Sequence, residues 1–379
     1  MDYKKESLKL HEKLKGKLVI SSKIPIKTRE DLSLLYTPGV AEVSRKIFEN
    51  KNEIYKYTIK GNSVAVITDG SSVLGLGNIG PEAALPVMEG KAILFKEFAN
   101  IDAFPICISE QNTKKTIETI KNIAPVFGGI NLEDIKAPEC FEIENALQEL
   151  GIPVMHDDQH GTAVVVLAGL LNSLKLANKK MEDVRIVING AGAAGISITK
   201  LLIKYGFQDI ILLDSKGIIN KKRNDLNKYK EEIAGITNKE NKEGNLINAI
   251  KNADIFIGVS KPNILKKEMI QLMNLPIIFA LANPDPEILP DEAKKAGAFI
   301  IATGRSDFPN QVNNVLAFPV IFRGALDIKA RKITDEMKIA AALALSKTIT
   351  PSVNKILPNP LDKSVVQRIA EAVKLAYSK

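Results

Sequence analysis

The sequence of 379 residues has no tryptophan and only two cysteines. Cys107 and Cys140 are far apart and form no CxxC spacing, which excludes a disulfide framework and a thiolate zinc site. The longest run of apolar residues and glycine, 163–171, covers about half of the roughly 20 residues that a membrane-spanning helix needs. The amino-terminal segment is studded with charge and lacks the apolar centre of a secretion signal. We therefore expect a cytoplasmic protein that does not cross a membrane.

The sequence also lacks the features of a nucleic-acid-binding protein. Its net charge of +8 comes from scattered lysines, with no arginine-rich block and no interleaved aromatic pattern. A positive charge of this size also attracts small acidic ligands such as nucleotides and carboxylates. Hydrophobic residues make up 45% of the chain and charged residues 25%, which is typical of globular rather than disordered proteins. We expect an enzyme-like body with a small-molecule substrate and no nucleic-acid partner.

Short buried-strand patterns recur along the chain, and helical patterns such as 113–123 and 196–206 lie between them. The predicted strands are 64–69, 103–109, 152–158, 184–190, 209–215, 254–260, 276–283 and 298–304. This alternation is typical of parallel sheets built from βαβ units, so the predicted fold class is α/β. In such sheets the ligand lies beyond the carboxyl ends of the strands, where most of these patterns close on a polar residue or glycine.

A long apolar helix is predicted over 161–178, between two groups of strands. We therefore expect a first α/β domain at 1–160 and a Rossmann-like, doubly wound parallel sheet at 161–329. The remaining chain, 330–379, carries only helical patterns, and these helices are expected to pack back on the first domain. No internal repeat or low-complexity linker separates these regions.

The motif GxGxxG occurs twice, and the context of the two copies differs. The copy at 190–195 follows a predicted strand directly, opens into a helix, and its first glycine precedes Asp214 by 24 residues. Glycines there let the backbone approach a pyrophosphate, the helix amino terminus attracts its charge, and the acid holds ribose hydroxyls. The predicted cofactor-binding residues are the loop and two polar strand ends: Gly190, Ala191, Gly192, Ala193, Ala194, Gly195, Asp214 and Ser260.

The other copy, at 75–80, lies several residues beyond its strand and has no comparable acid after it. It is expected to form a turn whose backbone amides face a different anion, such as a substrate carboxylate. A plain tight turn is the alternative interpretation.

The choice between NAD and NADP stays open, with NAD favoured. Asp214 indicates NAD, because a carboxylate repels the additional phosphate of NADP. Cations that could accept this 2′-phosphate follow soon after it in the chain: Lys216, Lys221, Lys222 and Arg223.

Three acids far apart in the sequence could bind one metal ion. They are Glu133, Asp134 and Asp158, with Asp157 as an alternative to Asp158. An all-oxygen set suits Mg²⁺ or Mn²⁺. Zinc is disfavoured, because His156 and His160 lack the glutamate of an HExxH motif and need not share a face. Taken alone, Glu133 and Asp134 could equally form a solvated turn or a helix amino terminus.

Several blocks of the sequence together resemble one family, the short bacterial and archaeal malic enzymes. The blocks, which begin near residue 30 and follow the expected order, are YTPGVAEV (36–43), TDGSSVLGLGNIGPEAALPVMEGKA (68–92), GGINLEDI (128–135), HDDQHGTA (156–163), GAGAAG (190–195), LANP (281–284) and NQVNNVLAFP (310–319). The resemblance implies oxidative decarboxylation of L-malate to pyruvate and CO₂ with NAD(P)⁺ and a divalent cation. It implies that 1–160 is the substrate and metal domain.

The resemblance also implies roles for individual residues. Lys91 would be the general base and Tyr36 the general acid, and Glu133, Asp134 and Asp158 would bind the metal. Asn283 and Asn314 would contact cofactor and substrate. Asp157 would hold Lys91, and His156 and His160 would be hydrogen-bonding groups around the site rather than ligands.

The residue chemistry agrees with these roles. A cation chelated by malate acidifies the hydroxyl, a base takes its proton as hydride leaves for the nicotinamide, and an acid protonates the enolate after CO₂ is lost. For this, the pKa of Lys91 must fall from about 10.4. Burial near a dication would lower it and pairing with Asp157 would raise it, and the sequence does not decide between them.

One position departs from the family. Larger members carry an arginine three residues before the first glycine of GLGNIG, and this chain has Ser72 there. Ser72, Lys91, the loop amides and the two asparagines would then bind the substrate. The resemblance suggests a homodimer, with Tyr36 reaching an active site shared between subunits. The competing functions are a metal-independent amino-acid dehydrogenase and a non-catalytic nucleotide-binding module.

Overall fold

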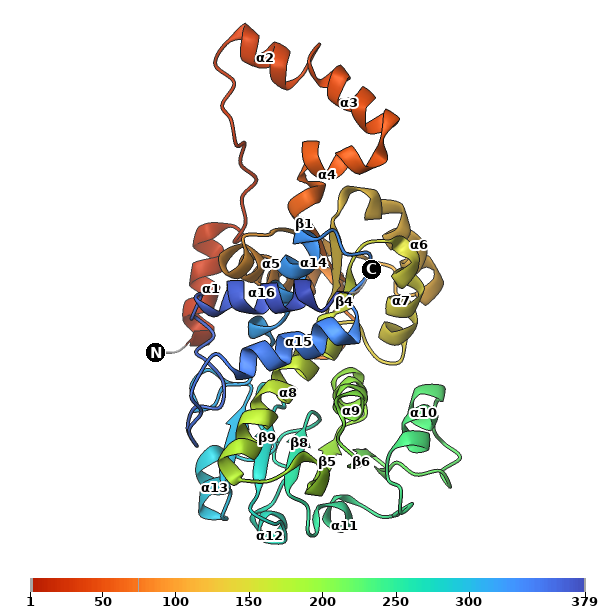
Figure 1. Cartoon of the computed structure of the whole chain (residues 1–379), viewed down its shortest axis with the longest axis vertical. Helices are drawn as coiled ribbons and strands as arrows, with labels where there is room; N and C mark the ends of the chain where they lie inside the picture. Colours follow the sequence, from red (N-terminus) through yellow and green to blue (C-terminus); the bar gives the residue numbers. More distant parts are fainter. Residues whose placement is uncertain (1–2, 74, 378–379) are drawn as a thin grey trace.

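The computed structural model describes residues 3–73 and 75–377 and contains two separate sheets, one in each half of the view in Figure 1. The first sheet is wholly parallel and has the strand order β2-β1-β3-β4. Its strands are β1 (Ser63–Thr68), β2 (Asp102–Cys107), β3 (Gly129–Leu132) and β4 (Val154–His156). The strands β1, β3 and β4 are fully buried, because helices cover both faces of the sheet.

The second sheet has the order β10-β9-β8-β5-β6-β7, and all its pairs are parallel except β6 with β7. Its strands are β5 (Arg185–Asn189), β6 (Asp209–Asp214), β7 (Gly217–Ile218), β8 (Ile255–Gly258), β9 (Ile277–Ala280) and β10 (Ile300–Thr303). The order reverses at β5, so the crevice beyond the ends of β5 and β8 is the place where an open α/β sheet binds a ligand.

Helices connect the strands of both sheets. Around the first sheet these are α5 (Gly80–Ala99), α6 (Thr113–Ile123) and α7 (Glu139–Leu147). Around the second they are α9 (Ala193–Tyr205), α10 (Lys228–Ile236), α11 (Leu246–Ile250), α12 (Lys267–Ile270) and α13 (Pro290–Lys295). Each joins a strand to a later one, which is the βαβ arrangement that the alternation of patterns predicts.

The helix α8 (Asp157–Ala177) joins the two halves of the molecule. Its side chains belong to one continuous hydrophobic core that includes residues from both sheets. By length and composition alone α8 could cross a membrane, but 67% of its apolar window is buried inside the protein. Burial of this extent is typical of a core helix. A second core fills the other face of the second sheet.

The carboxyl-terminal helices return to the middle of the molecule. They are α14 (Phe318–Asp327), α15 (Asp335–Ser346) and α16 (Val365–Leu375). Helix α14 packs against α5 and α16, and α15 packs against α8, α9 and α16. Phe318 and Phe322 of α14 both contact the ring of Phe95 of α5 edge to face. The chain therefore returns to the first sheet before its last two helices.

The amino-terminal segment contrasts with this packed body. It contains α1 (Tyr3–Leu14), α2 (Arg29–Leu35), α3 (Val40–Glu49) and α4 (Ile54–Tyr57). None of these four helices contains a buried residue. In Figure 1, α2 and α3 project away from the body, connected by a long extended stretch on one side and by α4 on the other. We call residues 18–50 the arm.

The predicted α/β fold class is confirmed. The helix predicted at 113–123 has these bounds in the structure. Each predicted strand overlaps an observed one, and only β1 and β2 begin outside the predicted range, by one residue. The strands β3 and β7 were not predicted, because they span only four and two residues and glycines flank or begin them. Helix α8 begins four residues before the predicted start, at Asp157, so the segment HDDQHGT contains a strand end followed by a first helical turn.

Candidate active site

Lys91 lies on the buried face of α5, although lysine is rarely buried without a partner. Helical spacing aligns it with Ala84, Met88 and Phe95, which are all buried. Its ammonium lies 4.4 Å from the centre of the Phe318 ring. The position therefore delivers one cation into an otherwise apolar layer, and acids must compensate for it.

Two carboxylates provide this compensation. The Nζ atom of Lys91 lies 2.7 Å from Oδ2 of Asp157 and 2.9 Å from Oε1 of Glu133. The amide of Asn314, in the short helix η6 (Asn314–Leu316), donates to the same Asp157 oxygen at 2.6 Å. Burial lowers the pKa of Lys91, but the two carboxylates outweigh it and raise the pKa well above its usual value. The ammonium form is therefore the one stabilised here.

The three predicted metal ligands converge. One carboxylate oxygen from each of Glu133, Asp134 and Asp158 lies within 4.8 Å of the other two. Glu133 and Asp134 follow β3, and Asp158 lies in the first turn of α8, which follows the neighbouring strand β4. Asp134 has a left-handed backbone (φ 53°), and its N–H donates to Asp158 Oδ2 at 2.9 Å. Burial raises the pKa values of Glu133 and Asp158 and outweighs the opposing effect of the Lys91 ammonium.

The two histidines of the block HDDQHGTA lie beside the acid cluster, with Nε2 of His156 3.6 Å from Asp158 Oδ2. His156 ends β4 and is fully buried, and burial lowers its pKa to about 4, so its ring is neutral. His160 points instead to Glu144 of α7, with Nε2 2.9 Å from Oε1. Glu144 also accepts hydrogen bonds from the His156 N–H and from Gln159. These contacts fix the beginning of α8, where Asp157 and Asp158 lie.

A cavity of about 650 Å³ lies over the acid cluster. It is lined by most of the residues that the sequence predicted for substrate, metal and cofactor: Ser72, Lys91, Glu133, Asp134, Asp158, Gly192, Ala193, Ala194, Ser260, Asn283 and Asn314. Asp157 lies beneath this surface with no exposed area. Gly161 leaves room for this carboxylate, because a Cβ there would lie 1.8 Å from Asp157 Oδ1.

Tyr36 is the predicted catalytic residue that the chain does not bring near this cavity. It follows α2 on the arm, and 63% of its surface is exposed. Among the residues 3–73 and 75–377 that the structure describes, the cavity lining includes none from the arm.

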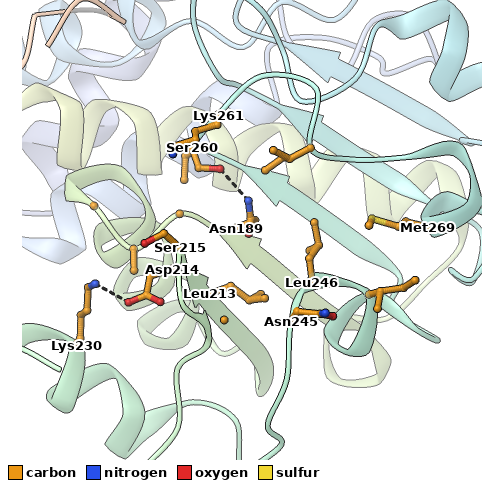
Figure 2. A pocket seen from close by; sticks show the side chains of 17 residues that line it. Asn189, Leu213, Asp214, Ser215, Lys230, Asn245, Leu246, Ser260, Lys261 and Met269 are labelled. Carbon is orange, nitrogen blue, oxygen red and sulfur yellow. Dashed lines mark hydrogen bonds and ion pairs between the residues drawn. The ribbon is translucent and has the colours of Figure 1, made fainter. Parts of the chain in front are cut away.

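A second cavity, of about 920 Å³, lies at the carboxyl ends of β5, β6 and β8 (Figure 2). It adjoins the first one, because Gly192, Val259 and Ser260 line both. Added Cβ atoms at Gly190 and Gly195 would lie within 2.6 Å of backbone oxygens, whereas one at Gly192 meets nothing within 4 Å. The glycines therefore allow close packing behind the loop and leave its front open at the amino terminus of α9.

Polar groups line the second cavity at both ends. Asn189 donates from its amide to the Ser260 hydroxyl at 2.8 Å, and Asp214 contacts Lys230 (Figure 2). Glu287, which is fully buried, accepts from the N–H groups of Ser260 and Ala282 and so connects the ends of β8 and β9. Asn189, Lys230 and Glu287 were not predicted, because no motif marks them and their proximity depends on the strand order.

Two family models match the chain. The malic enzyme NAD-binding domain matches residues 159–377, and the malic enzyme N-terminal domain matches residues 15–116 and 109–148. The chain belongs to the malic enzyme family. The chain is 56% identical to the bifunctional malic/malolactic enzyme of Bacillus subtilis (strain 168), in an alignment that covers 98% of this chain and 92% of that one.

Other malic enzymes resemble the chain over nearly its whole length. The NADP-dependent malic enzyme of Halomonas elongata is 48% identical over 97% of this chain and 92% of its own length. The crystal structure of the NAD-dependent malic enzyme from Thermotoga maritima has a TM-score of 0.94 and 54% identity, covering 97% of this chain and 98% of that one. The predicted malic enzyme is thereby confirmed over the amino-acid dehydrogenase and the non-catalytic module, and NAD or NADP is its class of cofactor.

Proposed function

We propose that the chain catalyses the divalent-cation-dependent oxidative decarboxylation of L-malate to pyruvate and CO₂, with NAD(P)⁺ as hydride acceptor. One observation carries this proposal: three convergent carboxylates and a buried lysine line a cavity that adjoins the cavity in front of the glycine loop. A substrate bound over the acids would therefore lie beside the nicotinamide end of a dinucleotide that extends across both cavities.

Glu133, Asp134 and Asp158 are the proposed ligands of Mg²⁺ or Mn²⁺. Three carboxylate oxygens are a hard donor set, and the cavity leaves room for water and substrate to complete the coordination. When bound, the cation would polarise the hydroxyl and carboxylate of malate and stabilise the enolate that decarboxylation leaves.

Lys91 is the proposed acceptor of the hydroxyl proton. Asp157 pairs with the ammonium of Lys91, and the amide of Asn314 donates to the same Asp157 oxygen, which fixes the position of this carboxylate. Glu133 contacts the ammonium from the side of the proposed metal site. Engagement of Glu133 as a ligand would withdraw one of the two charges that raise the pKa of Lys91, which favours the neutral base. Ser72, Asn283 and Asn314 line the same cavity and would bind the substrate carboxylates.

Tyr36 is the proposed donor of the proton to C3, and we propose that a second copy of the chain supplies it. The arm lacks buried residues and exposes apolar side chains such as Leu34 (69%) and Phe48 (88%). Exposed apolar surface of this kind favours association, and a twofold dimer would exchange two arms symmetrically.

A mixing experiment tests the shared site. Dimers of Tyr36→Phe and dimers of Lys91→Ala are expected to be nearly inactive by themselves. If Tyr36 acts across the interface, each mixed dimer contains one intact site, so random exchange restores about a quarter of wild-type activity. Activity that stays at the level of the separate variants after confirmed exchange would contradict the shared site.

The proposed reaction is tested with purified protein, L-malate, Mn²⁺ and either NAD⁺ or NADP⁺. We expect absorbance at 340 nm to rise and pyruvate to form in equal amount. Lys91→Ala is expected to lower kcat by about 10²–10⁴-fold, the range for loss of a general base. Lys96→Ala is the matched control, since Lys96 lies on the same helix but pairs with Asp102 at the surface. No reduction of either cofactor by the wild-type protein would contradict the proposal.

NAD is the proposed preferred cofactor and the cytoplasm the proposed location. Asp214 ends β6, where a carboxylate suits ribose hydroxyls better than a 2′-phosphate. Cys107 and Cys140 are both free thiols, as expected in a reducing compartment.

A further inference from the structure

Asp158 reaches the acid cluster from the first turn of α8, and the N-cap residue of this helix provides no side-chain cap. His156 occupies the N-cap position, and its side chain makes no capping hydrogen bond. Neither ring nitrogen of His156 has a hydrogen-bond partner among residues 3–73 and 75–377, which the structure describes. Because the first turn of a helix cannot satisfy its own N–H groups, an acceptor from outside α8 is needed to fix this turn.

The carboxylate of Glu144, on helix α7, is this acceptor. Its Oε1 atom accepts from the backbone N–H of His156 at 3.0 Å, and its Oε2 atom accepts from the side-chain amide of Gln159 at 3.0 Å. The ring Nε2 of His160 lies 2.9 Å from Oε1 and 3.0 Å from Oε2. These contacts flank Asp158 on both sides along the chain, so one carboxylate fixes the turn that bears this acid.

Glu144 is placed to orient other groups rather than to contact a substrate. It is buried and does not line the cavity over the acid cluster. Burial raises the pKa of Glu144, but the contacts with His160 outweigh burial and lower this pKa to about 2, so the side chain is ionised. The hydrogen bonds from the start of α8 compensate for burial of the charge, and loss of the carboxylate would leave their donors without an acceptor.

Gln159 is fixed from its other side as well. Its Oε1 atom accepts from the hydroxyl of Ser197 at 3.1 Å, and Ser197 lies on α9, the helix that follows the glycine loop. Both side chains are buried. Gln159 therefore cannot rotate to compensate for a lost contact with Glu144 without giving up its contact with Ser197.

We propose that Glu144 is a positioning residue that places Asp158 for metal binding. Glu133 and Asp134 follow β3, whereas the position of Asp158 depends on how α8 begins. The hydrogen bonds of Glu144 hold this turn so that the three carboxylates lie within 4.8 Å of one another before a cation binds. An arrangement that exists before binding costs less affinity than one that the cation must assemble. This inference rests on the proposed function for its metal class.

The test measures the Kd for Mn²⁺ by isothermal titration of the metal-free full chain, without malate or nucleotide. Glu144→Gln keeps the shape of the side chain but replaces one acceptor oxygen with an NH₂ group that faces donors. We expect the Kd to rise by about 10-fold or more, as when a group that orients a metal ligand is changed. Glu142→Gln is the matched control and should bind as the wild type does, because Glu142 lies on the same helix but pairs with Lys228 at the surface.

A second control separates positioning from stability. Asn172, further along α8, donates from its buried amide to the carbonyls of Ser346 and Ile356, at 3.0 and 2.8 Å. Asn172→Ala should lower the free energy of unfolding, because it leaves two acceptors unpaired, but should not change the Kd for Mn²⁺. In steady-state assays of Glu144→Gln, the KM for Mn²⁺ should rise with the Kd, whereas kcat at saturating Mn²⁺ should fall much less.

Gln159→Met is a second variant of the same contact. It keeps the length of the side chain but removes the amide that donates to Glu144, and the Kd for Mn²⁺ should rise by about threefold or more. An unchanged Kd in Glu144→Gln, or in Gln159→Met if Glu144→Gln does not fold, would overturn the proposal, and so would an equal rise in Asn172→Ala. A wild-type protein that binds Mn²⁺ but does not oxidise malate would overturn the proposed function and leave this proposal intact.

Discussion

The two charged clusters of the molecule are unbalanced in opposite directions. At the first sheet, the ammonium of Lys91 is surrounded by an excess of carboxylates: Glu133, Asp134, Asp157 and Asp158. At the second sheet, an excess of cations surrounds the acids: Lys216, Arg223 and Lys230 contact Asp214 and Asp225. A buried excess of negative charge needs a cation, and an excess of positive charge suits a phosphate. The sign of each imbalance therefore agrees with the ligand proposed for each cluster, a divalent cation at the first sheet and a nucleotide at the second.

The largest expected effect comes from removing the metal ligands. Chelation with EDTA should abolish malate oxidation, and added Mn²⁺ or Mg²⁺ should restore it. Asp158→Asn should lower kcat/KM by about 10³-fold or more, because the cation supplies several kcal/mol of stabilisation. Steady-state assays measure both. Cofactor binding should be unaffected, and a variant that loses NADH affinity equally would show that the two clusters are not independent.

The next effect distinguishes a buried ion pair from an exposed one. Asp157→Asn keeps the shape of the side chain but leaves Lys91 without its nearest counter-charge, and kcat should fall by about 10²-fold. Asp102→Asn is the matched control, because Asp102 pairs with Lys96 of the same helix at 2.8 Å but at the surface. That pair should matter little. Equal activities of the two variants in steady-state assays would contradict the positioning role of Asp157.

Two glycines offer a smaller test that separates stability from binding. Gly161→Ala places a Cβ 1.8 Å from Asp157 Oδ1, so the free energy of unfolding should fall by about 1–3 kcal/mol. Gly192→Ala meets nothing within 4 Å and should change stability by less than about 0.5 kcal/mol. It should instead weaken cofactor binding, because it narrows the approach to the loop. Denaturant titration and NADH binding measure these effects, and the reverse pattern would contradict the assignment of the two positions.

The smallest effect is expected at Ser72, the position at which the motif blocks depart from the resemblance. Ser72→Ala removes one neutral hydrogen-bonding group from the first cavity, so the KM for malate should rise by about 2–10-fold. The KM for the cofactor should not change. A KM for malate equal to that of the wild type would show that the loop amides and asparagines bind the carboxylates without Ser72.

The sequence predicted the parts of the molecule that depend on local pattern or on motif blocks. The α/β class follows from alternating strands and helices, and the glycine loop is recognisable from its strand and helix neighbours. The motif blocks also implied that Glu133, Asp134 and Asp158 converge. They did not give the strand order, in which β3 and β4 are neighbours and so bring these acids together.

The sequence could not predict contacts that depend on tertiary arrangement. The pairing of Lys230 with Asp214 joins a helix side chain to a strand end 16 residues away, and no periodicity marks it. The pKa of Lys91 is raised because two carboxylates from different elements lie within 3 Å of its Nζ atom. The direction of this pKa shift therefore depends on distances that the sequence does not give. The position of Tyr36 depends on the direction in which the arm projects from the rest of the molecule, and no local pattern in the sequence specifies this direction.

Direct measurement of Mn²⁺ binding tests the central claim most sharply. Isothermal titration of the metal-free full chain should give one Mn²⁺ per chain, and Asp158→Asn should abolish or strongly weaken this binding, whereas Asp102→Asn should not. A wild-type protein that binds no Mn²⁺ with malate present, or an Asp158→Asn variant that binds it with unchanged affinity, would contradict the account.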